Sequence, residues 1–471
     1  MTFVKSTHYD APVDEVFRWH TREGAFERLL PPWEAVDLER FDAGLEIGSR
    51  VSFLTRIGPV SKRWIGEHID FQPGKLFRDV QIEGPFAHWD HTHTFTLGPN
   101  GQGCVLEDRV EYRLPLGPLG ALFGGPFVRS KLERMFRFRH QRLAADLSLH
   151  AHTRIGKEDV MKVAVTGASG LVGGALVPLL TTGGHSAVRL VRRNPRADGE
   201  ARWDPATGAA PGALEGVDAI VHLAGENIAG KRWSAKQKQE IRDSRVLATR
   251  ALCESLTKLS VKPKTLICAS AIGYYGDRGD EQLDESSAKG TGFLAEVCDE
   301  WEAATQPAKD AGIRVVHMRF GIILSPKGGA LAKMLLPFKL GGGGILGSGN
   351  QYMSWISLDD VCGAILHALT NDSLSGPVNT VAPAPVTNRE YTKTLGSVLK
   401  RPTIFPMPAF AARAAFGEMA DHLLLGSQRV QPKVLLDSGY RFQHTQLEDA
   451  LRHLLGKSPS SKSVASVGAG A

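Results

Sequence analysis

Three glycines at a fixed spacing are the residues whose arrangement in this chain most directly predicts chemistry. Gly167, Gly170 and Gly173 follow the apolar segment Lys162–Thr166 and open a segment with the pattern of a helix. In such a strand-to-helix turn the first glycine permits a tight turn, the second lets backbone N–H groups approach a phosphate, and the third lets the helix pack against the strand. The spacing predicts a pyrophosphate site made by Gly167, Ala168, Ser169, Gly170, Leu171, Val172 and Gly173.

The residues after the next apolar segment predict which dinucleotide binds. Arg192 and Arg193 follow the segment 187–191, and no acidic residue stands before Asp198. A carboxylate at this point would accept hydrogen bonds from the ribose 2′-hydroxyl of NAD, whereas two guanidinium groups can bind a 2′-phosphate. We therefore expect NADP(H) in preference to NAD(H). The alternative interpretation is a pair of solvent-facing arginines in a loop.

Strands that alternate with helices are expected to position both groups of residues. The predicted strands are 162–166, 187–191, 219–223, 265–269 and 313–318, and the predicted helices are 170–182, 234–259 and 292–311. This order predicts an α/β fold of the Rossmann type, a doubly wound parallel sheet with helices on both faces. Leu223, Ala224 and Gly225 end the third strand in small residues, which would suit backbone that runs beside the nicotinamide ribose.

Residues 1–150 have a different pattern, that of an α+β domain. A first strand precedes a helical segment at 12–30, and a final helix is predicted at 127–149. Between them, alternating apolar and polar residues predict an antiparallel sheet with one wet face, in segments 50–57, 63–71, 77–82, 91–97 and 104–114. This order resembles the SRPBCC (polyketide cyclase/START-like) helix-grip fold. The resemblance implies an apolar pocket between the sheet and the last helix, and hence an apolar ligand.

Short motifs after residue 161 together resemble the short-chain dehydrogenase/reductase superfamily, in its extended, epimerase/dehydratase-like branch. They are the glycine-rich turn, His222-Leu-Ala-Gly and Ser270-Ala-Ile-Gly-Tyr-Tyr-Gly. More closely, Gly230-Lys-Arg-Trp and Arg319-Phe-Gly-Ile-Ile-Leu-Ser resemble an atypical subgroup labelled "epimerase family protein". That subgroup ends in a C-terminal domain of unknown function, which Gly426-Ser-Gln-Arg-Val-Gln-Pro-Lys resembles.

This resemblance and the change in composition imply a domain organisation. We expect a helix-grip domain at 1–150, a polar linker at 151–160 and a nucleotide-binding domain at 161–400. The family C-terminal domain would span 401–456, and the Ser-, Gly- and Ala-rich tail at 457–471 is predicted to be disordered.

The chain departs from the superfamily at the catalytic residues. Members of the superfamily use Tyr-x-x-x-Lys, in which the lysine lowers the pKa of the tyrosine, but none of the seven tyrosines here has a lysine four residues later. Phe293 and Val297 occupy the expected positions, and neither can transfer a proton. Ser270, Tyr274 and Tyr275 are the catalytic candidates that remain. The alternative is that the tyrosines only pack the wall of a pocket.

Composition excludes several other classes of protein. The net charge of +6 is spread along the chain, which favours a solvated surface over nucleic-acid binding. We expect no membrane insertion, and five cysteines without paired spacing predict buried thiols in a reducing cytoplasm. The segment His88-Trp-Asp-His-Thr-His93 contains metal-ligand residue types, but on a strand His88 and Asp90 would face away from His91 and His93. We therefore expect no metal site.

Two functions follow from these observations. The first is an NADP(H)-binding, epimerase/dehydratase-like oxidoreductase acting on a small molecule, with an N-terminal domain that binds an apolar ligand. The second is a non-catalytic, NADP-responsive regulatory or binding protein, one linked to cell division for example. The missing Tyr/Lys pair keeps the second function open, and the sequence leaves undecided whether the protein is an enzyme.

Overall fold

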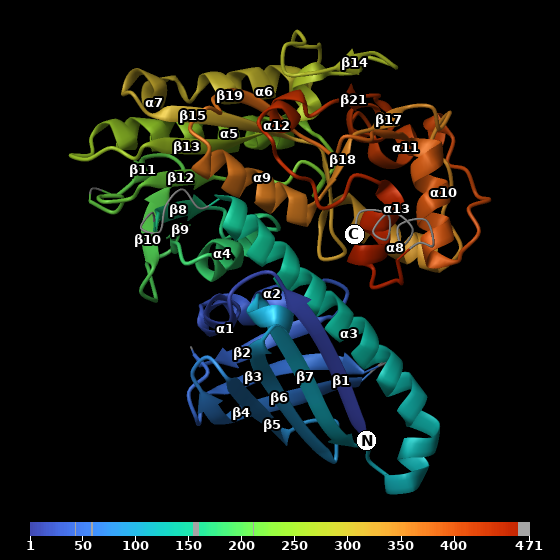
Figure 1. Cartoon of the computed structure of the whole chain (residues 1–471). Helices are drawn as coiled ribbons and strands as arrows, with labels where there is room; N and C mark the ends of the chain where they lie inside the picture. Colours follow the sequence, from blue (N-terminus) through green and yellow to red (C-terminus); the bar gives the residue numbers. More distant parts are fainter. Residues whose placement is uncertain (43, 58–59, 154–159, 211, 460–471) are drawn as a thin grey trace. The chain divides into compact units, whose positions relative to one another are not determined.

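The computed structural model describes residues 1–42, 44–57, 60–153, 160–210 and 212–459. Within these residues the chain forms two compact units. Figure 1 shows the chain coloured from blue at the N-terminus to red at the C-terminus. The first unit comprises 1–152 with the short segments 181–184 and 455–458, and the second comprises most of 153–454. No helix in the described part of the chain is both long and apolar enough to span a lipid bilayer.

A seven-stranded antiparallel sheet and a long helix form the first unit. The strands lie in the order β1-β7-β6-β5-β4-β3-β2. Their bounds are β1 Thr2–Tyr9, β2 Val36–Phe41, β3 Arg50–Ile57, β4 Val60–Gln72, β5 Leu76–Glu83, β6 His88–Leu97 and β7 Cys104–Arg113. The helices are α1 Val13–Thr21, α2 Ala25–Leu29 and α3 Gly117–Thr153, and Figure 1 shows α3 running beside β1. This is the predicted α+β helix-grip architecture.

Alternation along the strands separates a buried face from a wet face. On β6 the side chains of Trp89, His91, His93 and Phe95 are buried, whereas His88 is exposed. The predicted division of this histidine-rich segment between two faces is therefore confirmed. The buried face packs against α3, where Phe136 contacts the core formed by the strands.

Two helices of this unit differ from the predicted ones. The helix expected at 12–30 is broken into α1 and α2 at Gly24, whose φ of 90° is left-handed backbone that favours glycine. The last helix begins at Gly117, ten residues before the predicted start, and ends at Thr153. Residues 151–153 of the predicted linker thus continue α3. The rest of that linker, except residue 160, and nearly all of the predicted tail lie outside the described residues.

The second unit is built on an eight-stranded sheet in the order β11-β10-β9-β8-β12-β13-β15-β19. All its neighbours are parallel except β10 and β11. The bounds are β8 Lys162–Thr166, β9 Ser186–Val191, β10 Glu200–Asp204, β11 Gly208–Ala209, β12 Ala219–His222, β13 Thr265–Ala271, β15 Arg314–Phe320 and β19 Gly376–Thr380. From β10 to β15 the order is the 3-2-1-4-5-6 arrangement of dinucleotide-binding sheets, with its switch point between β8 and β12.

Helices cover both faces of this sheet, as predicted. They are α4 Gly173–Thr182, α5 Ala235–Thr257, α6 Phe293–Ala303, α7 Gln306–Asp310 and α9 Leu358–Thr370. Figure 1 shows α5, α6 and α7 on one face and α4 and α9 on the other. The helix predicted at 292–311 is split into α6 and α7, and Pro307 stands in the first turn of α7.

Shorter elements complete the second unit. They are a 3₁₀ turn at Ile272–Tyr275, β14 Gln282–Leu283, β16 Ile322–Leu324, α8 Gly329–Lys339, β17 Tyr352–Met353, β18 Trp355–Ser357, β20 Val386–Thr387, α10 Asn388–Leu399, α11 Ala409–Phe416, a π-helical turn at Asp421–Leu425, β21 Arg429–Val430, α12 Lys433–Asp437 and α13 Leu447–Leu454. The parallel pair β14 and β21 connects the C-terminal segment to the loop that follows β13.

Candidate functional site

The glycine-rich turn between β8 and α4 has the close backbone packing that the sequence predicts. Gly167 has a φ of 66°, and a Cβ added there would lie 3.0 Å from the carbonyl carbon of Leu223. A Cβ at Gly173 would lie 2.3 Å from the carbonyl oxygen of Gly167, so no side chain fits between the helix and the turn. The first N–H groups of α4 therefore lie directly behind the turn, where a helix N-terminus favours an anion.

A buried threonine connects this turn by hydrogen bonds to the residues that follow β12. The hydroxyl oxygen of Thr166 accepts hydrogen bonds from the backbone N–H groups of Leu223 (3.0 Å) and Ala224 (3.2 Å). The same hydroxyl lies 2.8 Å from Nδ1 of His222, whose Nε2 lies 3.0 Å from the hydroxyl of Thr249. The predicted residues 167–173 and 223–225 are thereby brought together at the carboxyl ends of β8 and β12, beside the switch point of the sheet.

The two arginines after β9 have different surroundings. Arg193 donates two hydrogen bonds to the carboxylate of Glu200, at 2.8 and 2.6 Å. This pairing lowers the pKa of Glu200 to about 2. Arg192 is exposed, and no ion pair or hydrogen bond of its side chain occurs within the described ranges. Glu200 begins β10, the strand next to β9, so sheet pairing rather than sequence distance places an acid beside Arg193.

Arg245 on α5 adds a cation close to the end of β12. Its guanidinium donates to the carbonyl oxygens of Glu226 and Ile241, each at 3.0 Å. A Cβ added at Gly225 would lie 3.4 Å from its Cζ. Burial lowers the pKa of Arg245. Its partners are neutral carbonyls, so its charge is not offset by a carboxylate within hydrogen-bond distance among the described residues.

Two of the three catalytic candidates belong to one buried polar network. Ser270 donates a hydrogen bond to Glu302 (2.7 Å), and Glu302 also binds Arg319 through both carboxylate oxygens, each at 2.8 Å. Arg319 donates to the hydroxyl of Tyr275 (3.0 Å), which in turn donates to Asn379 (2.8 Å). Each of these hydroxyl groups therefore already has partners inside the protein.

The third candidate, Tyr274, has a less enclosed position. Burial raises the pKa of Tyr275 to about 12, and that side chain is completely buried. Tyr274 is only half-buried, and the guanidinium of Arg319 lies 3.5 Å from the centre of its ring. Within the described part of the chain its hydroxyl has no hydrogen-bond partner. Of the three candidates, Tyr274 alone is partly exposed and has a hydroxyl without a hydrogen-bond partner among the described residues.

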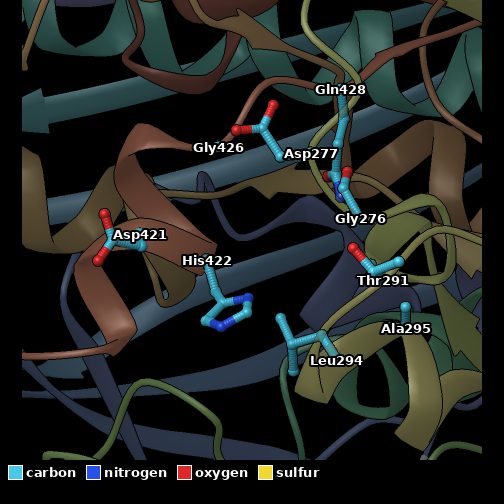
Figure 2. A pocket seen from close by; sticks show the side chains of 10 residues that line it. Gly276, Asp277, Thr291, Leu294, Ala295, Asp421, His422, Gly426 and Gln428 are labelled. Carbon is cyan, nitrogen blue, oxygen red and sulfur yellow. The ribbon is translucent and has the colours of Figure 1, made fainter.

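The C-terminal segment holds the loop that carries these tyrosines. Gln428 donates to the carbonyl oxygens of Ile272 (3.2 Å) and Gly276 (3.0 Å), and the backbone N–H of Ser427 donates to Asp277 (3.1 Å). Beside these contacts lies a small cavity of about 30 Å³, and Figure 2 shows His422 extending toward Leu294 in it. This volume accommodates about one water molecule.

The first unit contains a much larger cavity, of about 930 Å³. Aromatic and aliphatic side chains line most of it, among them Phe26, Phe53, Trp64, Phe86 and Leu132. One part of the wall is polar, because His20, His68, Asp79, His91, His93 and Arg139 also line it. A cavity of this size and lining is suited to a small, mostly apolar molecule.

The ionisable groups in this wall have strongly shifted pKa values. Burial on its own would lower the pKa of His91, but the carboxylates of Asp79 and Asp108 raise it to about 9. Burial lowers the pKa of His20 to about 4. Sequence reasoning missed Asp79 and Asp108, since neither lies in the histidine-rich segment. Strand pairing brings them there, because Asp79 is opposite His91 and Asp108 is opposite His93.

Comparison with known proteins defines the class of this chain. Residues 163–381 match the NAD dependent epimerase/dehydratase family, residues 1–148 match polyketide cyclase / dehydrase and lipid transport, and residues 407–454 match a domain of unknown function, DUF1731. The chain is a Rossmann-type, NAD(P)-binding member of the short-chain dehydrogenase/reductase class joined to an SRPBCC domain.

Its relatives place it more narrowly. The epimerase family protein MT2273 of Mycobacterium tuberculosis is 48% identical over 290 residues, which are 61% of this chain and 96% of the relative. The human epimerase family protein SDR39U1 is 37% identical over 298 residues, which are 63% of this chain and 100% of the relative. This chain belongs to the epimerase family proteins.

Two solved structures are similar to it. A nucleoside-diphosphate sugar epimerase from Corynebacterium glutamicum covers 99% of this chain and 93% of its own, with 35% identity and a TM-score of 0.80. The structure of human SDR39U1 (isoform 2) with NADPH covers 63% of this chain and 99% of its own, with 35% identity and a TM-score of 0.58.

Proposed function

We propose that the second unit binds NADP(H) at the carboxyl ends of β8, β9 and β12 and uses it in redox or isomerising chemistry on a small molecule. The glycine-rich turn carries this proposal, because its packing leaves no room for a side chain at Gly167 or Gly173. The human relative was solved with NADPH, which supports the choice of cofactor. When bound, the nicotinamide would accept or supply a hydride.

The chain's own residues have separate duties in this proposal. The N–H groups of the turn and of the first turn of α4 would hold the pyrophosphate, while Arg192, exposed and unpaired within the described ranges, would contact the 2′-phosphate. Arg193 would join it only by sharing or releasing Glu200. Arg245, close to Gly225, would add positive potential near the ribose.

Proton transfer, if the protein is an enzyme, would fall to Tyr274 rather than to Ser270 or Tyr275. The hydroxyls of Ser270 and Tyr275 are committed to Glu302 and Asn379, and breaking either bond leaves a buried polar group unsatisfied. The guanidinium of Arg319 lies over the ring of Tyr274, and this cation–π contact would hold the ring in position. The substrate would then approach from the side of the loop 272–277.

The test is to measure binding of NADPH and NADH, followed by NADPH oxidation with a panel of carbonyl compounds and lipids. Tight binding of NADPH, with turnover that Tyr274→Phe removes, supports the oxidoreductase. No affinity for either coenzyme would overturn the proposal as a whole.

A non-catalytic, NADP-responsive protein is the second candidate. It is favoured by one observation: none of the seven tyrosines in the sequence has a lysine four residues later. Tight NADPH binding with no turnover over the panel would support it.

In either case we infer that the cavity of the first unit holds an apolar ligand, which native mass spectrometry of the purified protein would detect. All five cysteines are buried, which supports the expectation of a reducing, cytoplasmic setting.

A further inference from the structure

Three side chains in the wall of the large cavity have the geometry of a metal site. Asp79 on β5 and His91 and His93 on β6 each offer a ligand atom, and these atoms lie within 4.8 Å of one another. Oδ1 of Asp79 lies 3.3 Å from Nδ1 of His91 and 3.6 Å from Nε2 of His93. Two ligands bound to one ion at about 2.1 Å, at angles between 90° and 110°, are about 3.0–3.4 Å apart. The observed separations are close to this range.

The outer nitrogens of both imidazoles lie close to one carboxylate, that of Asp108. Nε2 of His91 lies 3.0 Å from Oδ1 of Asp108, and Nδ1 of His93 lies 2.6 Å from the same oxygen, off the line of a straight hydrogen bond. When each imidazole carries its proton on that side, the nitrogen facing Asp79 is left with a free lone pair. A carboxylate behind the imidazoles is the arrangement that orients histidine ligands in metal proteins.

The groups around Asp108 hold this arrangement in place. Oδ2 of Asp108 lies 2.6 Å from Nε2 of His140 on α3, and Nδ1 of that histidine lies 2.8 Å from the hydroxyl of Thr7. The ring of His93 stacks on Phe77, with ring centres 4.0 Å apart. Asp108 therefore has partners on more than one element, and its side chain is 5% exposed. Asp79, at 22%, faces the cavity.

The local charge also favours a cation. Asp79 and Asp108 contribute two negative charges, and Arg139, which also lines the cavity, contributes one positive charge. A divalent ion would displace the proton on the nitrogen of His91 that faces Asp79, and this proton would pass to solvent. With both imidazoles then neutral, the two carboxylates and the arginine leave a net negative charge, which the ion would offset. Two imidazoles and one carboxylate suit zinc or ferrous iron, and both metals leave coordination positions open in sites of this kind.

We propose that Asp79, His91 and His93 bind one divalent transition-metal ion whose open positions face the apolar cavity, with Asp108 as the positioning residue for both histidines. The ion would give the cavity a polar anchor for an oxygen atom of its ligand. The sequence predicts no metal site because the segment 88–93 divides its own ligand residues between two faces, whereas the third ligand comes from the adjacent strand. This inference concerns the first unit and does not depend on NADP(H) binding.

The test uses the full chain, stripped of metal with a chelator and titrated with Co²⁺, a spectroscopic substitute for zinc and iron. We expect one equivalent to bind with a visible absorption band and to be displaced by Zn²⁺. Asp79→Asn and His93→Gln should weaken binding at least about 100-fold, and Asp108→Asn should weaken it about 10- to 100-fold. NADPH affinity should be unchanged in all three variants.

Two variants serve as controls. His88→Gln changes an exposed histidine on the same strand and should leave Co²⁺ binding unaltered. His453→Gln changes another group with nearby ligand atoms, Asp359, His444 and His453, and should also leave the Asp79-dependent binding unaltered. Binding that persists in Asp79→Asn, or a wild-type protein that binds no Co²⁺, overturns the proposal.

A second measurement covers the case in which the cluster variants do not fold. Anomalous scattering from crystals of the wild-type protein soaked with Co²⁺ would locate the ion directly. An ion bound by Asp79, His91 and His93 supports the proposal, and an ion only elsewhere overturns it.

Discussion

Both units bury a group of polar side chains. The two groups differ in whether their polar atoms bond only to one another or border a cavity. In the second unit Ser270, Glu302, Arg319, Tyr275 and Asn379 satisfy one another, and the chain of bonds ends inside the protein. In the first unit, two histidines turn one nitrogen each toward Asp79 beside a cavity of about 930 Å³. The number of buried polar groups therefore does not identify a site. What distinguishes the group in the first unit is that its ring nitrogens and the carboxylate of Asp79 border a cavity.

The comparison implies that in the second unit backbone atoms, rather than buried side chains, form the surface that binds NADPH. The adjacent glycines Gly173 and Gly174 allow a matched test of this. A Cβ at Gly173 would lie 2.3 Å from the oxygen of Gly167, whereas a Cβ at Gly174 would lie 3.8 Å from the oxygen of Ala168, an ordinary contact. We expect Gly173→Ala to weaken NADPH binding about 100-fold or more, because the turn must move away from the phosphate.

Gly174→Ala should bind NADPH as the wild type does and should stabilise α4 by about 0.5–1 kcal/mol. Titration calorimetry of both variants measures the affinity. Equal affinity of the two alanine variants for NADPH would show that the turn is not the binding surface. It would contradict the idea that backbone atoms bind the cofactor in the second unit.

The arginines after β9 provide the next largest effect. Reversing the charge of Arg192 and Arg193 together should weaken NADPH binding about 10- to 100-fold, since charge-assisted contacts to the 2′-phosphate are lost. NADH binding should change less than about threefold by the same argument. Arg192→Ala alone should account for most of the loss, because Arg193 is paired with Glu200. Equal losses for the two coenzymes would contradict the assignment of NADP(H).

The sequence was sufficient for the elements whose signal is local. The five predicted strands of the parallel sheet are β8, β9, β12, β13 and β15, and the glycine-rich turn lies between the first of them and α4. Hydrophobic runs and turn residues specify these features within a few positions of the chain. The break at Gly24 has a local signal too, since a glycine in a helical pattern marks a candidate break.

Contacts across strands were not predictable in this way. Glu200 reaches Arg193 because β10 pairs with β9, and Asp79 reaches His91 because β5 pairs with β6. Register depends on the whole sheet, so alternation along a single strand shows which face a residue occupies but not its neighbour. Arg319 likewise reaches Glu302 because β15 lies near α6, and nothing in the motif that begins at Arg319 indicates this partner.

Removing one hydroxyl from that network tests whether it is structural. Tyr275→Phe removes the hydrogen bonds to Oδ1 of Asn379 and Nη1 of Arg319, and no other described residue replaces them. We expect the free energy of unfolding of the second unit to fall by about 1–3 kcal/mol, with NADPH affinity unchanged. Tyr274→Phe is the matched control and should change stability by less than about 0.5 kcal/mol. Urea denaturation, followed by the loss of NADPH fluorescence, measures both. Should Tyr275→Phe keep full stability and lose turnover, Tyr275 would be a catalytic residue after all.

Protonation of a buried histidine can be compared between two sites, one in each unit. Carboxylates raise the pKa of His91 in the first unit, whereas burial lowers the pKa of His222 in the second unit to about 4. At His222 the folded protein therefore binds fewer protons than the unfolded chain does between pH 6.5 and 4. The stability that neutral His222 contributes is complete above pH 6.5 and is lost as the pH falls toward 4, with about 2 kcal/mol lost by pH 5.

Hydrogen exchange of the β8 and β12 amides, corrected for intrinsic rates, measures this loss between pH 7 and pH 5. His222→Gln should reduce the pH dependence by about 2 kcal/mol. Part of the pH dependence should remain, because burial also lowers the pKa of His317 on β15 to about 4. His88→Gln, on the wet face of β6, should retain the full pH dependence. An unchanged pH dependence in His222→Gln would mean that the ring between Thr166 and Thr249 is charged in the folded protein. His222 would then be charged near neutral pH, as the raised pKa of His91 implies for that residue.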